Sequence, residues 1–159
     1  MSNTLNVIDA VKTLIKSGVA SLKIDNFPVS VAEGLYPDAI VTELSSLGYP
    51  AVMLKAYDSD FPDASNLGQT YIEALPLGIM IYVDNNGATG TQEKLLKIED
   101  AIIDELSTNA DLGLHEAYVL VNSINRGSRV EGTPDLYRVG FYDSLSISEI
   151  MITINYRRC

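Results

Sequence analysis

Three features of this chain have residue types that could support chemistry, and each lacks part of the required pattern. The first is the turn NNGATG (residues 85 to 90), which joins a strand-like run to a helix-like run. Free backbone N–H groups at such a helix start can bind a phosphate. The turn has no lysine, and neither GxGxxG nor a P-loop motif is present. A plain connection between a strand and a helix is the favoured interpretation.

The second feature is the acidic stretch DSDFPD, which contains Asp58, Asp60 and Asp63. Its spacing resembles that of the oxygen ligands in calcium loops. However, such loops also need a glycine at position six and a bidentate glutamate at position twelve, and both are missing. We therefore expect no metal here, but a solvated acidic loop or an acidic docking patch for arginines on a neighbouring molecule.

The third feature is a single histidine and a single cysteine, which are the candidate base and nucleophile of the chain. His115 is the only histidine, so it cannot form a histidine metal cluster within one chain, and any Ser-His-acid triad would have to use it. Cys159 is the only cysteine and has no evident activating neighbour. No catalytic constellation emerges. The sequence thus predicts a protein that is not an enzyme and needs no cofactor.

The charges of the chain are segregated along its length. Residues 1 to 125 hold 17 acidic residues against six lysines, a net charge of −11, whereas residues 126 to 159 hold four acidic residues against five arginines. Complementary charges orient and select partners, and arginine is the cation favoured at interfaces. We therefore predict a subunit or partner interface that uses Arg126, Arg129, Arg157, Arg158, Asp58, Asp60 and Asp63.

Length and composition indicate one domain, residues 1 to 159, with a real hydrophobic core. The net charge of −10 argues against a protein that binds nucleic acid tightly, because phosphate binding needs a basic surface. The first residues do not have the pattern of a secretory signal. The strongest apolar run, residues 75 to 83, is too short to span a bilayer.

Hydrophobic periodicity predicts three helices. The first covers residues 4 to 17, with Thr4 as its cap and Gly18 as its end. The second is short, opens at Pro37 and ends at Gly48. The third covers residues 92 to 106, capped by Thr89, with an apolar stripe at Leu95, Ile98, Ile102 and Leu106. Its acids Glu99, Asp100, Asp104 and Glu105 are expected to face solvent or a partner.

Alternating and continuous apolar runs predict five strands, at residues 51 to 57, 71 to 84, 115 to 121, 136 to 142 and 149 to 156. Pro76 is expected to break or bend the second. Residues 58 to 70 and 122 to 135 are expected to be polar loops, the latter containing Arg126 and Arg129. The fold class is therefore α+β, with a mainly antiparallel or mixed sheet of about five strands and helices on one face.

The layout of these segments resembles the tail terminator, or tail completion, proteins of long-tailed bacteriophages. The likeness lies in an opening NVIDAVKTLIKS helix, a YPAVMLKAY strand, an LGIMIYVD strand that turns into a KLLKIEDAIIDEL helix, and a closing ITINYRR strand. Residues 25 to 48 fit least well, and the short helix there is consistent with an insertion.

The resemblance implies a virion protein, assembled in the host cytoplasm, that forms a homo-oligomeric ring, expected to be six-fold. Such a ring stops polymerisation of the tail tube at its head-proximal end and offers a surface for head–tail joining. The implied partners are further copies of the chain, the tail tube protein, head–tail connector or neck proteins and, in contractile tails, the sheath. DNA passes through the lumen without specific binding, and no membrane is involved.

Two alternatives stay open at this point. A neck or head–tail connector protein would share the size, acidity and ring-forming habit of a tail terminator. A small-molecule-binding regulatory α+β domain, with NNGATG as its ligand turn, would belong to a different class.

Overall fold

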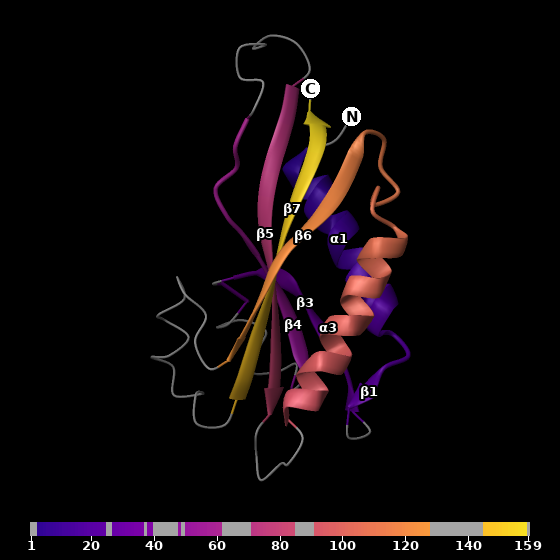
Figure 1. The fold of residues 1–159 in the computed structure, drawn as a ribbon, viewed down its shortest axis with the longest axis vertical. Helices are drawn as coiled ribbons and strands as arrows, with labels where there is room; N and C mark the ends of the chain where they lie inside the picture. The colour runs from indigo at the N-terminus through magenta and orange to yellow at the C-terminus, as the bar shows by residue number, and fades with distance from the viewer. Residues whose placement is uncertain are drawn as a thin grey trace.

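The computed structural model describes residues 3–24, 27–36, 38–39, 48, 50–61, 71–84, 91–127 and 145–158. Among these residues two helices, α1 (Thr4–Val19) and α3 (Thr91–Thr108), cover one face of a five-stranded sheet (Figure 1). The predicted α+β class, with helices on one face of the sheet, is confirmed.

The sheet has the strand order β3-β4-β5-β7-β6, and only the β3–β4 pair is parallel. The strands are β3 (Ser30–Leu35), β4 (Ala51–Ala56), β5 (Tyr71–Asp84), β6 (Ala117–Gly127) and β7 (Leu145–Arg158). A separate short hairpin pairs β1 (Lys23–Ile24) with β2 (Phe27–Pro28). The two longest strands, β5 and β7, pair over their whole length, from Tyr71 opposite Arg158 to Asp84 opposite Leu145.

The core lies between the helices and the sheet face that they cover. The predicted stripe of α3 is buried throughout, as are Val7, Ile8, Val11 and Ile15 of α1. From the sheet, alternate residues point inward, which buries Leu75, Leu77, Ile79, Ile81, Ile150, Ile152, Ile154 and Tyr156. Each fully buried aliphatic side chain contributes about 1.5–3 kcal/mol, so this layer is the main source of stability. The opposite side of the sheet is called the outer face below.

The ends of α1 differ from the prediction. Asn3, and not Thr4, is the N-cap, because its side-chain oxygen accepts the backbone N–H of Asn6 at 2.9 Å. Gly18 lies inside the helix and does not end it. A Cβ on Gly18 would lie 3.0 Å from the Cβ of Glu105 and 3.1 Å from the carbonyl oxygen of Ala101. Gly18 therefore allows the close contact of α1 with α3.

Pro76 does not break β5, contrary to the prediction. It stays in register opposite Thr153, and its carbonyl accepts the backbone N–H of Tyr57 at 3.0 Å. The carbonyl and the nitrogen of a strand residue point to the same side, here toward β4. The pairing with β4 ends at Ala56 opposite Leu77, so the proline lies at the end of this ladder, where its missing N–H affects only the return bond to Tyr57.

The third predicted strand extends further than expected, into the segment that was predicted to be a polar loop. Residues 122–127 continue β6, so Arg126 lies opposite Ser148 in the ladder and not in a loop. A register shift between Val121 and Ser123 absorbs one extra residue, which is how a polar run stays paired. β7 likewise begins earlier than predicted, at Leu145.

Several predictions lie on residues outside the described set. These are the strand at 136 to 142, most of the short helix at 37 to 48, the Thr89 cap and the turn at 85 to 90. Within the second of these, Asp38 and Ala39 are helical.

Replacing Gly18 by valine should lower the free energy of unfolding by about 1–3 kcal/mol, because the new side chain must enter the contact between α1 and α3. Urea unfolding followed by circular dichroism measures the change. Ser17→Val, at the neighbouring exposed position of α1, isolates the helix propensity of valine. Equal losses in the two variants would show that the helix contact is not tight.

Candidate functional site

The first polar cluster surrounds Glu73, a carboxylate only 1% exposed near the start of β5. Arg158 donates to its Oε1 at 2.6 Å, and the Tyr156 hydroxyl donates to its Oε2. Thr4 and Ser59 each place a hydroxyl 3.3 Å from the same Oε2. The four donors come from α1, from the segment after β4 and from β7. We call these five residues the Glu73 cluster.

The Glu73 cluster joins the two ends of the described chain, which lie together in Figure 1. Thr4 Oγ1 lies 3.0 Å from the Tyr156 hydroxyl and accepts a hydrogen bond from Arg158 at 3.1 Å. Burial, reinforced by the hydrogen bond to Glu73, raises the pKa of Tyr156 to about 12. The tyrosine is therefore a neutral donor at physiological pH. Both oxygens of the Glu73 side chain are thus bonded inside the fold, which ties α1 to β5 and β7.

A second cluster lies on the outer face, around Glu149. Its side chain is 2% exposed and accepts the Tyr57 hydroxyl at 2.7 Å. A Cβ on Gly78 would lie 2.4 Å from Glu149 Oε2, so the glycine makes room for the carboxylate. The Lys55 ammonium lies 4.7 Å from the ring centroid of Tyr36 and 4.6 Å from that of Tyr57, within cation–π range.

Burial raises the pKa of Glu149 above its usual value, against the opposing effects of the Tyr57 hydrogen bond and the Lys55 charge. Burial also raises the pKa of Tyr57, and its bond to Glu149 adds to this. The ionised form of Glu149 is therefore less favourable in the folded protein than in the unfolded chain.

A third buried acid corrects the sequence analysis. Glu99 was expected to face solvent or a partner, but it is fully buried and accepts the Ser148 hydroxyl at 2.7 Å. Glu99 follows Leu95 by four positions and precedes Ile102 by three, so helical spacing already places it on the apolar stripe. The hydrogen bond fastens α3 to β7.

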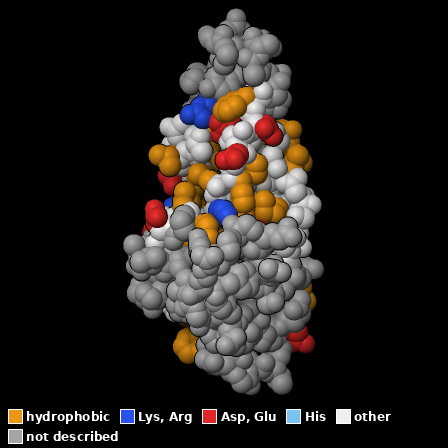
Figure 2. Space-filling model, turned by 90° about the vertical axis from the view of Figure 1, so that its left-hand side faces the viewer, with side chains coloured by type: hydrophobic (Ala, Val, Ile, Leu, Met, Phe, Trp, Pro, Cys, Tyr) orange, Lys and Arg blue, Asp and Glu red, His pale blue; other side chains and the backbone are white. Residues whose placement is uncertain are grey.

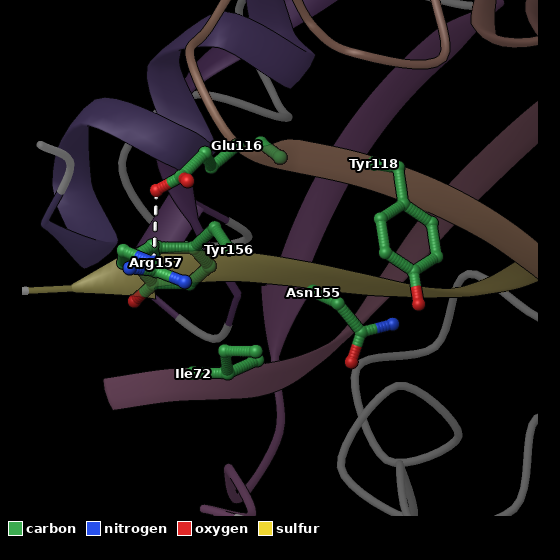
Figure 3. Close-up of a pocket in the computed structure, with 7 residues that line it drawn as sticks. Ile72, Glu116, Tyr118, Asn155, Tyr156 and Arg157 are labelled. Carbon is green, nitrogen blue, oxygen red and sulfur yellow. Dashed lines mark ion pairs between the residues drawn. The ribbon is translucent and has the colours of Figure 1, made fainter. Parts of the chain in front are cut away.

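A surface pocket of about 420 Å³ opens where β5, β7 and β6 run side by side (Figure 3). Its lining includes Ile72, Glu116, Tyr118, Asn155, Tyr156 and Arg157. Arg157 Nε lies 2.8 Å from Glu116 Oε2, and the backbone N–H of Arg157 donates to the Glu116 carbonyl at 3.1 Å. Glu116 has a φ of 55°, in the left-handed region that few residues with a side chain adopt. Two bonds to Arg157 thus accompany an unusual backbone conformation at the pocket rim.

The β6 side of the sheet leaves apolar side chains in solvent. Tyr118, Leu120 and Val121 are 52%, 47% and 43% exposed, and we call these three residues the β6 margin. Residues 117 to 125 contain no charged residue and no proline. Natural sheets usually guard an edge strand with such residues, which prevent pairing with other chains.

The opposite edge strand, β3, is guarded in this way. Lys12 donates to the backbone carbonyl of Glu33 at 2.7 Å, and Lys16 forms an ion pair with the Glu33 side chain. Both edge strands have a register shift, between Val31 and Leu35 in β3 and between Val121 and Ser123 in β6. The two edges of the sheet therefore differ in charge, since β3 contains Glu33 and residues 117 to 125 of β6 contain no charged residue.

The predicted interface residues fall into different environments. Asp58 and Asp60 are exposed, and we call them the acidic margin; the backbone of Asp60 pairs with that of Ala74 through bonds of 3.0 and 2.8 Å. Arg157 lines the pocket, whereas Arg158 is bonded within the Glu73 cluster. Arg126 lies in β6 with its backbone alone described. Asp63 and Arg129 lie outside the described residues.

Within the described ranges, no three His, Cys, Asp or Glu side chains are grouped so that they could hold a metal ion. His115 is exposed, with Nε2 3.9 Å from the Glu116 carboxylate. Neither described helix is both long and apolar enough to cross a membrane.

Comparison with known proteins adds no assignment. No protein-family model matches the chain, and no curated protein matches it in sequence.

Replacing Arg158 by alanine should lower the free energy of unfolding by about 2–4 kcal/mol, because it leaves the buried Glu73 carboxylate without its cation. Arg157→Ala is the matched control: its ion pair is half-exposed and should contribute at most about 1 kcal/mol. Urea unfolding at neutral pH measures both. Similar losses in the two variants would contradict the assignment of Glu73 as a buried ion-pair partner.

Replacing Glu149 by glutamine should change how stability depends on pH. The folded protein binds a proton on Glu149 more tightly than the unfolded chain, so wild-type stability falls as pH rises from about 4.5 through the raised folded pKa. The variant lacks this loss, and its stability relative to wild type should increase across that window. Urea unfolding at several pH values measures it, with Glu93→Gln on α3 as an exposed control. A difference from wild type that does not vary with pH would sink the prediction.

Proposed function

We propose that this chain is the subunit of a ring that caps the head-proximal end of a bacteriophage tail tube. The proposal rests first on the resemblance described above. The segments that carry it correspond to α1, β4, the second half of β5, α3 and the end of β7. These elements build both layers of the fold, so the likeness concerns the core of the subunit and not one isolated motif.

The observation that carries the proposal furthest is the exposed and uncharged β6 margin. A monomer that exposes apolar side chains along an uncharged edge strand presents a surface suited to another protein. An assembly protein needs such a surface, whereas a freely diffusing monomer usually avoids it.

The proposed mechanism is mechanical and forms or breaks no covalent bond. Copies close into a ring through a heterologous interface, in which one patch of a subunit meets a different patch of the next. The ring covers the end of the growing tube, which prevents addition of further tube subunits, and its other side receives the head–tail connector or neck. The net charge of −10 favours a lumen through which DNA moves without sticking.

A neck connector is the nearest alternative, and the partner distinguishes the two. A terminator binds the end of the tail tube, and a connector binds the head vertex. In contractile tails a terminator would also contact the sheath. Either role places the protein in the virion after assembly in the host cytoplasm.

A regulatory binding domain is the second candidate, and the pocket of about 420 Å³ is the observation in its favour. That volume lies within the range of small-molecule sites. Thermal unfolding with a panel of nucleotides and carboxylic acids addresses it, because a ligand that binds the folded state raises Tm.

Mixing the purified chain with tail tube protein of the same virus should give a complex at one end of each tube. It should also shorten tubes that polymerise in its presence. Negative-stain electron microscopy, with tube lengths measured at several ratios of the two proteins, is the test. Tubes of unchanged length with bare ends would refute the terminator role.

A further inference from the structure

The acidic margin and the pocket beside Arg157 lie at the same height along the strands of the sheet. Asp60 is opposite Ala74, Ala74 is opposite Asn155, and Asn155 is opposite Tyr118. Directly opposed residues in antiparallel strands place their side chains on the same face. Here it is the outer face, because Glu73 and Leu75, the residues flanking Ala74, are buried on the other face.

One row therefore crosses the outer face from an acidic end to an end beside Arg157. The acidic end is the segment after β4, in which Asp60 pairs with Ala74 of β5. The other end is the β6 margin. On the described part of the side that faces left in Figure 1, acidic, basic and hydrophobic side chains lie close together (Figure 2).

The lining of the pocket offers hydrogen-bond donors that could bind a carboxylate. The ion pair with Glu116 uses Arg157 Nε, and an arginine has further N–H donors on its two terminal nitrogens. The Asn155 amide and the Tyr118 hydroxyl are drawn on the same side of β7 in Figure 3 and are further donors. Ile72 supplies an apolar wall. A carboxylate that enters beside Arg157 thus meets a cation and two neutral donors, which together act against the charge of the Glu116 carboxylate in the same lining.

We propose that this pocket receives the acidic margin of a second copy of the chain, so that Asp58 and Asp60 of one subunit dock beside Arg157 and Tyr118 of the next. The inference rests on the ring proposed above and names its subunit contact. The charge complementarity of the two sites selects this occupant. Their position at opposite ends of one row lets every copy use both at once, as a heterologous contact requires. Docking there also covers the exposed part of Tyr118, the aromatic residue of the β6 margin.

A pair of complementary variants tests this contact. Arg157→Glu makes both ends of the row acidic, and Asp60→Lys places a cation beside Asp58 at the acidic end. Each variant alone should self-associate about tenfold or more weakly than wild type, because each places a charge opposite one of the same sign at every interface. An equimolar mixture should regain the wild-type assembly, since the two variants can alternate around a ring with opposite charges at each contact. Mass photometry at low and high salt measures the assemblies, and urea unfolding verifies that both variants fold.

Lys23→Glu and Asp104→Lys are the matched controls, because they make the same charge changes at exposed positions on β1 and α3. Wild-type-like assembly of both controls, with loss in the two variants and recovery in their mixture, is the expected result. Assembly that survives both reversals, or that the controls weaken equally, would overturn this contact and leave the ring proposal standing. A wild-type chain that stays monomeric at high concentration would also overturn it, while tube-end binding would still decide the proposed function separately.

Discussion

The pairing of β5 with β7 is the constraint on which the rest of the structure depends. These two strands of 14 residues match over their whole length, and every other strand of the sheet attaches to one of them directly or through β4. A shift of one residue would turn each inward isoleucine of β7 to the outer face. The same register brings Glu73 opposite Tyr156 and places Glu149 diagonally beside Gly78, so it also determines where the buried carboxylates find donors.

The three buried glutamates have the same structural effect, which is to link separate elements of the fold through a hydrogen bond. Glu73, Glu99 and Glu149 each accept a hydroxyl from a different part of the chain, and each bond links two elements that apolar contacts alone would hold less specifically. A buried carboxylate without its donor is costly, so alternative packings that lose the bond are disfavoured. The fold thereby gains a defined relative placement of the elements that these bonds link.

Much of the fold follows from local pattern, and the misses have identifiable causes. The stripe of α3 and the alternation of β7 predicted burial correctly because spacing alone sets which face is apolar. Pro76 and the end of β6 were mispredicted because their outcome depends on a neighbouring strand, which periodicity does not show. Glu73 alternates with Leu75 and Leu77, so strand periodicity alone could have predicted its burial. The burial of Glu149 could not be predicted in this way, because the space that Gly78 leaves for it depends on how β5 pairs with β7. For the same reason, sequence singled out Arg157 and Asp60 but could not reveal that one row of the sheet connects their sites.

The position of β7 also has a consequence for synthesis in the cell. It is the last described strand to leave the ribosome, yet it lies between β5 and β6, which emerge earlier. Until β7 arrives, β5 lacks a neighbour on one side and β6 lacks the strand with which it pairs, so the sheet cannot be completed before β7 is available. Strand partners far apart in sequence also make folding slow and leave strand edges open to other chains. The edges of β5 and β6 that face β7 therefore stay open until residues 145 to 158 insert between them.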